Sequence, residues 1–427
     1  MASAGILFGL MFLFMFLCIP VGIAIALACC GLALITGTVD LSLIPSKMVM
    51  GNDSFIFLAV PMFTFAGYLM EEGNLSERLV DWVNKLFGRA HGSMGVVTIV
   101  TCAIFAALTG SGAATTASVG AIMYPLMRKA GYADQDAAGI IASGGVLGPI
   151  IPPSIPMIIY GSAMGVSISA MFLGGVIPGL IMAGGFLVYN RWYAVHHKLP
   201  RSEVKYTVKE KLQATWKSLG VLFLPVLILG GIYGGLFTPT EAAAAAIVYS
   251  TILMIFYKRF SFKRYFRVMQ RTASTTGVIL LIVAISNAFS FLLTKERIPT
   301  TLTDAAVPLL HNQYIYLAVV IIIFLIAGAL MDTAPALLIL APILVPIGVV
   351  FGLSELHLGV LMCIIMISGL ITPPFGLNLF TISSTSGVSF EKATKGALPM
   401  IIICIIVCIL CAYIPQLITF LPSVVGT

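Results

Sequence analysis

The chain has 427 residues, of which 59% are hydrophobic and 9% charged, and its formal net charge is +7. Soluble domains carry about 25% charged residues, so this composition excludes a soluble globular protein. A membrane β-barrel is also disfavoured, because the apolar runs are long and continuous rather than alternating. The basic residues gather in two short segments, which is typical of cytoplasmic loops and does not indicate nucleic-acid binding. We therefore expect an all-α polytopic membrane protein.

The first quarter of the chain predicts two spans and an amphipathic helix. Residues 6–35 are predicted as one span with a kink at Pro20, and residues 54–70 as the second. Asn74 and Glu77 then have the spacing of a capping box. The segment that they open, residues 75–87, carries charges on one side and apolar residues on the other. That pattern predicts an arm lying along the membrane surface.

Two short apolar segments, residues 94–108 and 113–127, are separated only by Gly110, Ser111 and Gly112. We interpret them as a helical hairpin that enters and leaves on the same side, and a pair of full spans is the alternative. Residues 134–163 follow as a helix broken near Pro152 and Pro153, because a proline inside a helix removes a backbone donor and clashes with the preceding turn. Residues 171–193 predict the next span.

The second half repeats this order. Thr238, Pro239 and Glu241 form a strong helix start. The predicted elements are a span without a clear counterpart at 219–236, a helix at 242–257, a span at 275–293, a second hairpin at 314–330 and 334–350, a second broken helix at 355–384 and a last span at 395–413.

The repeat keeps a constant offset. Pro346 follows Pro125 by 346 − 125 = 221 residues, and Gly369 follows Gly148 by 369 − 148 = 221. The same offset relates Ser111 at the first hairpin tip to Asp332 at the second. Duplicated halves with paired broken segments are the best sequence pointer to the binding site of a secondary transporter.

The basic segments, residues 196–217 and 258–271, predict the orientation. Both are expected on the cytoplasmic side. With the hairpins counted as no net crossing, an odd number of spans separates equivalent points of the two halves, so the second half is expected to be inverted. This count places the N-terminus in the cytoplasm and the C-terminus outside.

The hairpin tips and helix breaks have the chemistry of a cation site. Glycines and prolines leave backbone carbonyls free, and Ser111 and Thr115 add hydroxyls. Asp332 is a carboxylate in an otherwise apolar region, which marks it as a functional candidate, and capping of the following helix is the alternative. Asn287 and Asn378 are weaker candidates, since hydrogen bonding between helices would also explain them.

An enzyme is disfavoured. A nucleophile at Ser111 would need a neighbouring base, but the five histidines fall in predicted loops or at segment ends. The sequence also contains no HExxH zinc motif and no phosphate-binding lysine motif.

These motifs together resemble those of a known family, the large membrane subunit (M subunit, DctM-like) of tripartite ATP-independent periplasmic (TRAP) transporters. The resemblance covers nearly the whole chain. It is carried by residues 109–118, 148–154, 238–244, 331–332 and 371–376.

The resemblance implies an inverted-repeat transporter of the ion-transporter superfamily, with two re-entrant hairpins and two broken helices, which works as an elevator in a bacterial inner membrane. It implies sodium-driven import of an organic acid, such as sialic acid or a C4-dicarboxylate. The implied partners are a small membrane subunit (Q, DctQ-like), a periplasmic substrate-binding protein and membrane lipid, with Na⁺ as coupling ion and no organic cofactor.

The resemblance also implies a division of the chain and a set of site residues. Scaffold helices with an arm would occupy 1–90 and 218–311, the two halves of a transport domain 91–195 and 312–427, and a basic cytoplasmic loop 196–217. The first sodium site would be formed by Thr109, Gly110, Ser111, Gly112, Gly145, Pro149 and Pro153. The second would be formed by Met331, Asp332, Thr333, Gly369 and Thr372. The substrate would bind near Ser111, Thr115, Ser154, Thr372 and Asn378.

Two other functions fit the sequence less well. A passive anion channel is the first alternative, but a channel needs no closed cation sites at paired breaks. A membrane enzyme or structural subunit is the second. Concentrative uptake distinguishes the transporter from both.

Overall fold

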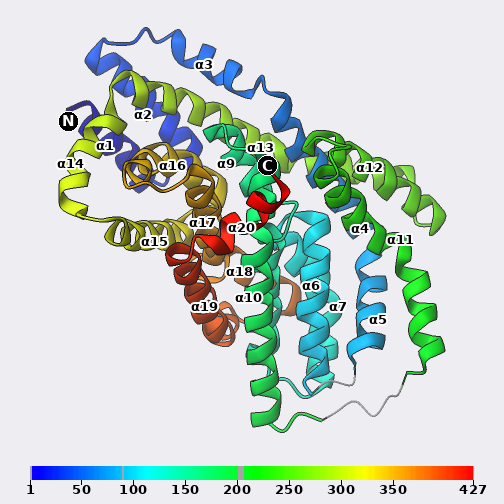
Figure 1. Ribbon diagram of the computed structural model, residues 1–427. Coiled ribbons are helices and arrows are strands. Elements are labelled where there is room, and N and C mark those ends of the chain that lie inside the picture. The colour runs from blue at the N-terminus through cyan, green and yellow to red at the C-terminus, as the bar shows by residue number, and fades with distance from the viewer. Residues whose placement is uncertain (1, 89–90, 201–205, 427) are drawn as a thin grey trace.

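The computed structural model describes residues 2–88, 91–200 and 206–426, and within these ranges all regular structure is helical (Figure 1). The first half contains α1 (Ala2–Phe16), α2 (Val21–Thr36), α3 (Leu43–Asn52), a 3-10 turn (Phe55–Leu58), α4 (Ala59–Glu72), α5 (Leu75–Phe87), α6 (Ser93–Thr109), α7 (Gly112–Lys129), α8 (Asp134–Ile150), α9 (Ile155–Met164) and α10 (Ile168–His196). The second half contains α11 (Val208–Tyr233), α12 (Pro239–Phe256), α13 (Phe262–Lys295), α14 (Ile298–Leu310), α15 (Gln313–Leu330), α16 (Thr333–Val350), α17 (Glu355–Ser368), a 3-10 turn (Gly369–Ile371), α18 (Leu377–Ser386), α19 (Phe390–Tyr413) and α20 (Gln416–Val425).

The two hairpins and the two broken helices are confirmed, and they keep the predicted register. The first hairpin joins α6 and α7, and the second joins α15 and α16. Helix α7 begins at residue 112 and α16 at 333, so that 333 − 112 = 221. The broken helices α8–α9 and α17–α18 begin at residues 134 and 355, again 221 apart.

The prediction of a single first span is wrong. The chain instead forms two short helices, α1 and α2, which pack against each other, and it turns between them at residues 17–20. Pro20 stands directly before the first residue of α2, where its missing N–H costs no helical hydrogen bond. The prediction that the N-terminus is cytoplasmic counted this stretch as one crossing. The side on which the N-terminus lies stays a prediction.

This division supplies the counterpart that the span at 219–236 lacked. Helix α11 ends at residue 233, and 233 − 221 = 12 falls within α1, while α12 corresponds in the same way to α2. Each half therefore opens with a helical pair. Helix α13 then spans 34 residues without interruption, whereas its counterpart in the first half is divided into α3, a 3-10 turn and α4.

The two basic segments are partly helical, so their prediction as loops needs correction. Helix α11 begins at Val208 and α13 at Phe262, which places Lys217 and Arg271 on helices. Residues 201–205 of the first segment lie outside the described residues. Helices α3 and α20 were not predicted.

The two predicted caps have different outcomes. The box at α12 is confirmed: Glu241 N donates to Thr238 Oγ1 at 3.3 Å, and Thr238 N donates to Glu241 Oε2 at 2.8 Å. The box at α5 is not formed, because Asn74 has a left-handed backbone (φ 55°) and its side chain donates to Glu77 Oε1 instead of capping the helix.

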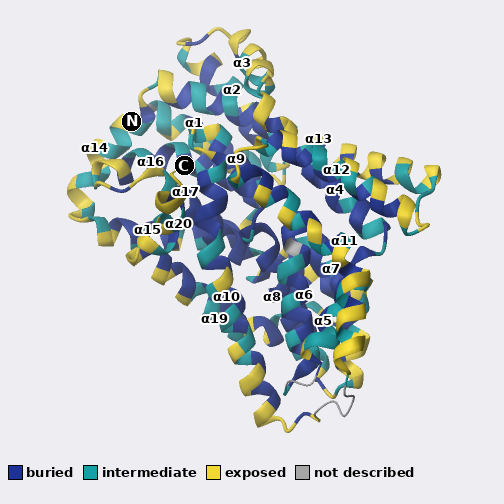
Figure 2. Cartoon of the chain, turned by 45° about the vertical axis from the view of Figure 1, so that its right-hand side comes forward, coloured by how far each residue is buried: buried dark blue, intermediate teal, exposed yellow. Residues whose placement is uncertain are grey.

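The core lies around α8, whose residues from Ala137 to Ile150 are all buried (Figure 2). Small residues make this possible, because they let helix backbones approach closely. A methyl group added at Gly139 would overlap the backbone of Gly396 in α19. Since α8 belongs to the first half and α19 to the second, the two halves are packed into one another at this crossing.

Among the described residues, nine helical segments are long and apolar enough to cross a membrane. The all-α membrane fold that composition predicted is therefore confirmed. The division into scaffold and transport domains stays a prediction.

Candidate functional site

The two hairpin tips meet at a cavity of about 230 Å³. Ser111 from the first tip and Asp332 from the second both line it, although they are 221 residues apart in the sequence. Helices α4 and α13 supply a further wall through Thr64, Tyr68 and Thr275. The cavity thus draws on both halves of the chain.

The N-terminal ends of several helices surround this cavity. Gly112 begins α7, Ile155 begins α9 and Thr333 begins α16, and all three residues line the cavity. Helix N-termini carry partial positive charge and unpaired N–H groups, so they attract anions. The described lining residues include no Lys, Arg or His, which leaves these helix ends as its positive groups.

The first tip is held in place by its own polar groups. Ser111 caps α7 by accepting a hydrogen bond from Ala114 N at 3.4 Å, and the Thr115 hydroxyl donates to Ser111 O at 2.8 Å. Gly110 has a left-handed backbone (φ 60°), and a methyl group there would lie 2.8 Å from Pro153 O. The tip therefore rests against the break between α8 and α9, and only glycine fits at position 110.

Buried oxygen atoms converge beside this tip, around Gly145 of α8. A methyl group at Gly145 would overlap Thr116 Oγ1 and would lie 2.8 Å from Gly112 O and 2.9 Å from Asn378 Nδ2. Thr116 Oγ1 and Asn378 Oδ1 are both buried and have no hydrogen-bond partner among the described residues. Buried polar groups are normally paired, so this set has unused capacity to bind a cation.

The polar group at the second tip is the carboxylate of Asp332. Asp332 Oδ1 accepts a hydrogen bond from Thr333 N at 2.7 Å, so the carboxylate does cap α16, as the alternative interpretation expected. Its side chain remains exposed at the cavity. Gly369 lies so close to Gly328 of α15 that a methyl group would come within 2.5 Å of the Gly328 carbonyl. The Thr372 hydroxyl donates to Ser368 O at 3.1 Å.

The structure separates the predicted site residues into two groups. The cavity lining contains Thr109, Gly110, Ser111, Gly112, Pro149, Asp332 and Thr333. The lining does not contain Gly145, Pro153, Met331, Gly369, Thr115, Ser154, Thr372 or Asn378. Of the proposed substrate ligands, only Ser111 faces the cavity, and the structure places Asn378 beside Gly145 instead.

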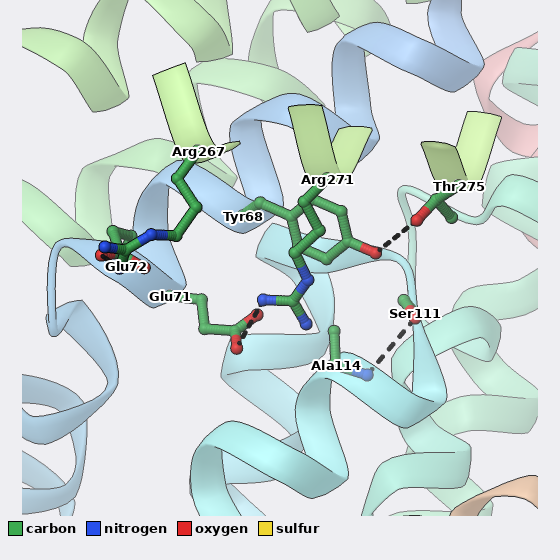
Figure 3. A network of polar contacts seen from close by, with 8 residues as sticks. All are labelled: Tyr68, Glu71, Glu72, Ser111, Ala114, Arg267, Arg271 and Thr275. Atoms are coloured by element: carbon green, nitrogen blue, oxygen red, sulfur yellow. Dashed lines mark hydrogen bonds and ion pairs between the residues drawn. The ribbon is translucent and has the colours of Figure 1, made fainter. Parts of the chain in front are cut away.

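The α4 and α13 residues of the lining were missed by the sequence analysis. Their hydroxyls are joined by a hydrogen bond between Tyr68 Oη and Thr275 Oγ1 at 3.1 Å (Figure 3). Gly67 allows the first tip to approach α4, since a methyl group there would lie 3.0 Å from Thr109 Cα. One tyrosine and one threonine within apolar spans give no periodic signal, so no sequence pattern could have found them.

Two halves that meet through hairpin tips and broken helices at one cavity define a membrane protein of the transporter class. Comparison with known proteins agrees with this class. Residues 8–417 match the family described as "Tripartite ATP-independent periplasmic transporter, DctM component". The chain belongs to this family of TRAP transporter large permease proteins.

Individual relatives support the assignment. The chain is 38% identical to the 2,3-diketo-L-gulonate TRAP transporter large permease protein of Escherichia coli over 399 residues, which cover 93% of this chain and 94% of the relative. It is 37% identical to the C4-dicarboxylate TRAP transporter large permease protein of Pseudomonas aeruginosa, with 89% of each chain covered. The crystal structure of the YdaH transporter of Alcanivorax borkumensis has a similar fold, with a TM-score of 0.65, 13% identity and coverage of 86% of this chain and 87% of that one.

The protein is therefore a permease subunit and not an enzyme, as the sequence predicted, since its relatives are named as permeases. With nine long apolar helices in the described part of the chain, it is a multi-pass inner-membrane protein. Within the described ranges, no group of three His, Cys, Asp or Glu side chains could hold a metal ion. Cation binding at the cavity would depend on hydroxyl, amide and carbonyl oxygens together with the carboxylate of Asp332.

Proposed function

We propose that this chain imports an organic carboxylate across the inner membrane and that the import is driven by sodium. The observation that carries the proposal is the position of Ser111 and Asp332, equivalent residues of the two repeats, at one cavity. Binding sites of secondary transporters lie at such repeat interfaces, between discontinuous helices.

A carboxylate fits the positive groups of the cavity. The N-termini of α7, α9 and α16 line the cavity wall, and helix N-termini favour anions by about 0.3–1 kcal/mol each when exposed and by more when partly buried. The relatives named for 2,3-diketo-L-gulonate and for C4-dicarboxylates both handle carboxylates. Sialic acid, which the family resemblance implied, is a carboxylate as well.

Sodium fits the oxygen atoms beside the cavity. Helix C-terminal ends and free carbonyls are the usual ligands of Na⁺ in discontinuous membrane helices. Gly112 O and Thr116 Oγ1, which lie at Gly145, and Asn378 Oδ1, which lies at Gly112, would supply the first site. Asp332 would supply the second and would offset the cation charge next to the substrate.

The proposal includes the partners and the movement that the family resemblance implies. A periplasmic binding protein would deliver the substrate, and a small membrane subunit would pack beside this chain. The helices that carry the tips would move together against α4 and α13, as in an elevator. Gly67 supports this arrangement, because it lets the first tip pass close to α4 without a side chain in between.

The test is uptake into proteoliposomes that contain this chain and its small subunit. Radiolabelled N-acetylneuraminate, succinate and 2,3-diketo-L-gulonate are supplied with their binding proteins, with and without an inward sodium gradient. We expect one of them to accumulate above its external concentration only when sodium is present. Equilibration without accumulation would indicate a channel, and accumulation without sodium would contradict the coupling.

Asp332→Ala is the diagnostic variant for the second sodium site. We expect it to abolish sodium-dependent accumulation while the protein still elutes as a single species in detergent. Unchanged coupling in this variant would leave Asp332 with only its capping role at α16.

A further inference from the structure

Two hydroxyl groups give the wall formed by α4 and α13 its polar character. Tyr68 Oη and Thr275 Oγ1 share a hydrogen bond of 3.1 Å, and either atom can be the donor. The third hydroxyl on this wall, that of Thr64, is occupied, because it donates to Val60 O of its own helix at 2.8 Å. The Tyr68–Thr275 pair uses one of its two O–H groups internally, so the other O–H and several lone pairs can bind a ligand.

The ring of Tyr68 packs against the guanidinium group of Arg271 (Figure 3). The guanidinium carbon lies 4.1 Å from the ring centroid, which is a cation–π contact. The same guanidinium donates to Glu71 Oε1 at 3.0 Å, and Glu71 is on α4 close to Tyr68. Arg271 therefore reaches from α13 to α4, where it fixes the ring and the direction of its hydroxyl.

A second ion pair between the same helices provides an internal comparison. Arg267 pairs with Glu72 at 3.2 Å, one helical turn before Arg271. Neither ion pair lines the cavity itself. Arg271 contacts the ring of Tyr68, a lining residue, whereas among the described residues Arg267 has no cation–π contact. Both pairs join α13 to α4, but only the Arg271 pair is connected to the cavity.

We propose that Tyr68, together with Thr275, selects carboxylates that carry a second hydrogen-bonding group, a hydroxyl, carbonyl or second carboxylate. Arg271 is the positioning residue that holds Tyr68 for this contact. The inference rests on the proposed function: helix N-termini hold one carboxylate, and the hydroxyl pair receives the other polar end of the substrate. A plain aliphatic monocarboxylate would remove water from the hydroxyl pair without replacing its hydrogen bonds, and sites of this kind discriminate strongly against such analogues.

The decisive experiment measures uptake kinetics for five proteins: wild type, Tyr68→Phe, Arg271→Lys, Arg271→Gln and Arg267→Gln. The probe is whichever of N-acetylneuraminate, succinate and 2,3-diketo-L-gulonate the wild type accumulates, each of which has the second polar group. Tyr68→Phe keeps the ring and removes only the hydroxyl. Arg271→Lys keeps the charge but loses the planar face that stacks on the ring.

We expect KM to rise about tenfold in Tyr68→Phe and in Arg271→Gln, which is the loss of one good hydrogen bond. Arg271→Lys should be intermediate, and Arg267→Gln should stay within about twofold of the wild type. Equal effects of Arg267→Gln and Arg271→Gln would reduce both arginines to clamps between helices and overturn the inference. An unchanged KM in Tyr68→Phe would overturn it as well.

A transport-independent measurement locates the substrate directly. Thr275→Cys is made in a background with Cys18→Ser and Cys30→Ser, since Cys18 is exposed and Cys30 half-buried whereas the other cysteines are buried. The probe should protect the introduced thiol from a charged thiol reagent in the presence of sodium. Labelling that the probe does not slow would contradict the contact at Thr275.

Failure of this inference can be told apart from failure of the proposed function. If the wild type accumulates a probe and the Tyr68 and Arg271 variants keep its KM, only the selectivity role is wrong. If the wild type accumulates none of the three probes, the proposed function fails, and the inference fails with it.

Discussion

The two hairpin tips occupy equivalent positions in the repeat but have different chemistry. The first has Gly110 and Ser111 where the second has Met331 and Asp332, since 110 + 221 = 331 and 111 + 221 = 332. The helix break beside the first tip is buried at Pro153, whereas the break beside the second tip is exposed at Pro374. The same backbone design therefore supports a closed and an open site.

Side-chain volume explains the difference. Gly145 of the first half corresponds to Met366 in the second, because 145 + 221 = 366. At the first tip, glycine lets α7, α8 and α18 approach closely enough to bring several oxygen atoms together. At the second, Met366 is a large buried residue, and Asp332 brings one carboxylate to the cavity. The repeated backbone is therefore shared by the two tips, and the residues at the tips give the two proposed sites different candidate ligands.

The largest effect is expected from a substitution that fills the space around Gly145 at the first tip. Gly145→Ala places a methyl group against Thr116 and Gly112 O, and overpacking of this kind costs about 1–3 kcal/mol. We expect sodium-driven uptake to fall by more than about tenfold, because the methyl group would occupy the proposed cation position. Gly184→Ala is the control, since nothing lies within 4 Å of its added methyl group. Normal uptake by Gly145→Ala would show that sodium does not bind beside Gly145.

Thr116→Val tests the same site without filling it. The hydroxyl has no partner among the described residues, so its replacement by a methyl group should leave thermal stability unchanged or slightly higher. The sodium concentration for half-maximal uptake should nevertheless rise about tenfold if one ligand is lost. Thr101→Val is the matched control. The hydroxyl of Thr101 in α6 is also buried without a partner among the described residues, but it is not among the atoms nearest to Gly145. A common shift in both variants would contradict a specific role for Thr116.

Asp332→Ser makes the second tip resemble the first. Serine is also a good N-cap, so α16 should keep its start, and stability should change by less than about 1 kcal/mol. Uptake should persist, unlike in Asp332→Ala, because the serine hydroxyl keeps one oxygen at the proposed site. Its dependence on sodium concentration should be shallower, because the proposed charged ligand is removed. The slope is read from uptake rates over a sodium titration, and an unaltered slope would assign Asp332 to capping alone.

The smallest effect concerns the two helix breaks. Ser154 is buried and caps α9 by accepting from Met157 N at 3.3 Å, so Ser154→Ala should lower stability by about 1 kcal/mol. Its counterpart Phe375 (154 + 221 = 375) is 59% exposed, so Phe375→Ala should cost less. Thermal unfolding in detergent compares the two variants. A larger loss at Phe375 would mean that a partner covers the second break in the assembled transporter.

The sequence alone determined the membrane class, the repeat and both hairpins, because these depend on properties that lie along the chain. The apolar runs, the constant spacing between Pro125 and Pro346, and the short breaks at residues 110–112 and 331–332 can all be seen in the order of residues along the chain. The start of α12 at Thr238 was predictable for the same reason, since a capping box involves four consecutive residues. Asn74 has a similar pattern but no cap, because its backbone adopts a left-handed turn that the spacing does not reveal.

Only the tertiary structure decided how the first helical pair folds and which residues meet at the cavity. The turn after Phe16 depends on packing between α1 and α2, and hydropathy does not distinguish two short helices from one long span. Tyr68 and Thr275 are 207 residues apart, and no periodicity connects them. Asn378 was predicted at the substrate site, but the structure places it beside Gly145. The direction of its side chain is set by the crossing of α18 with α7 and α8, which is a contact between the two halves of the chain.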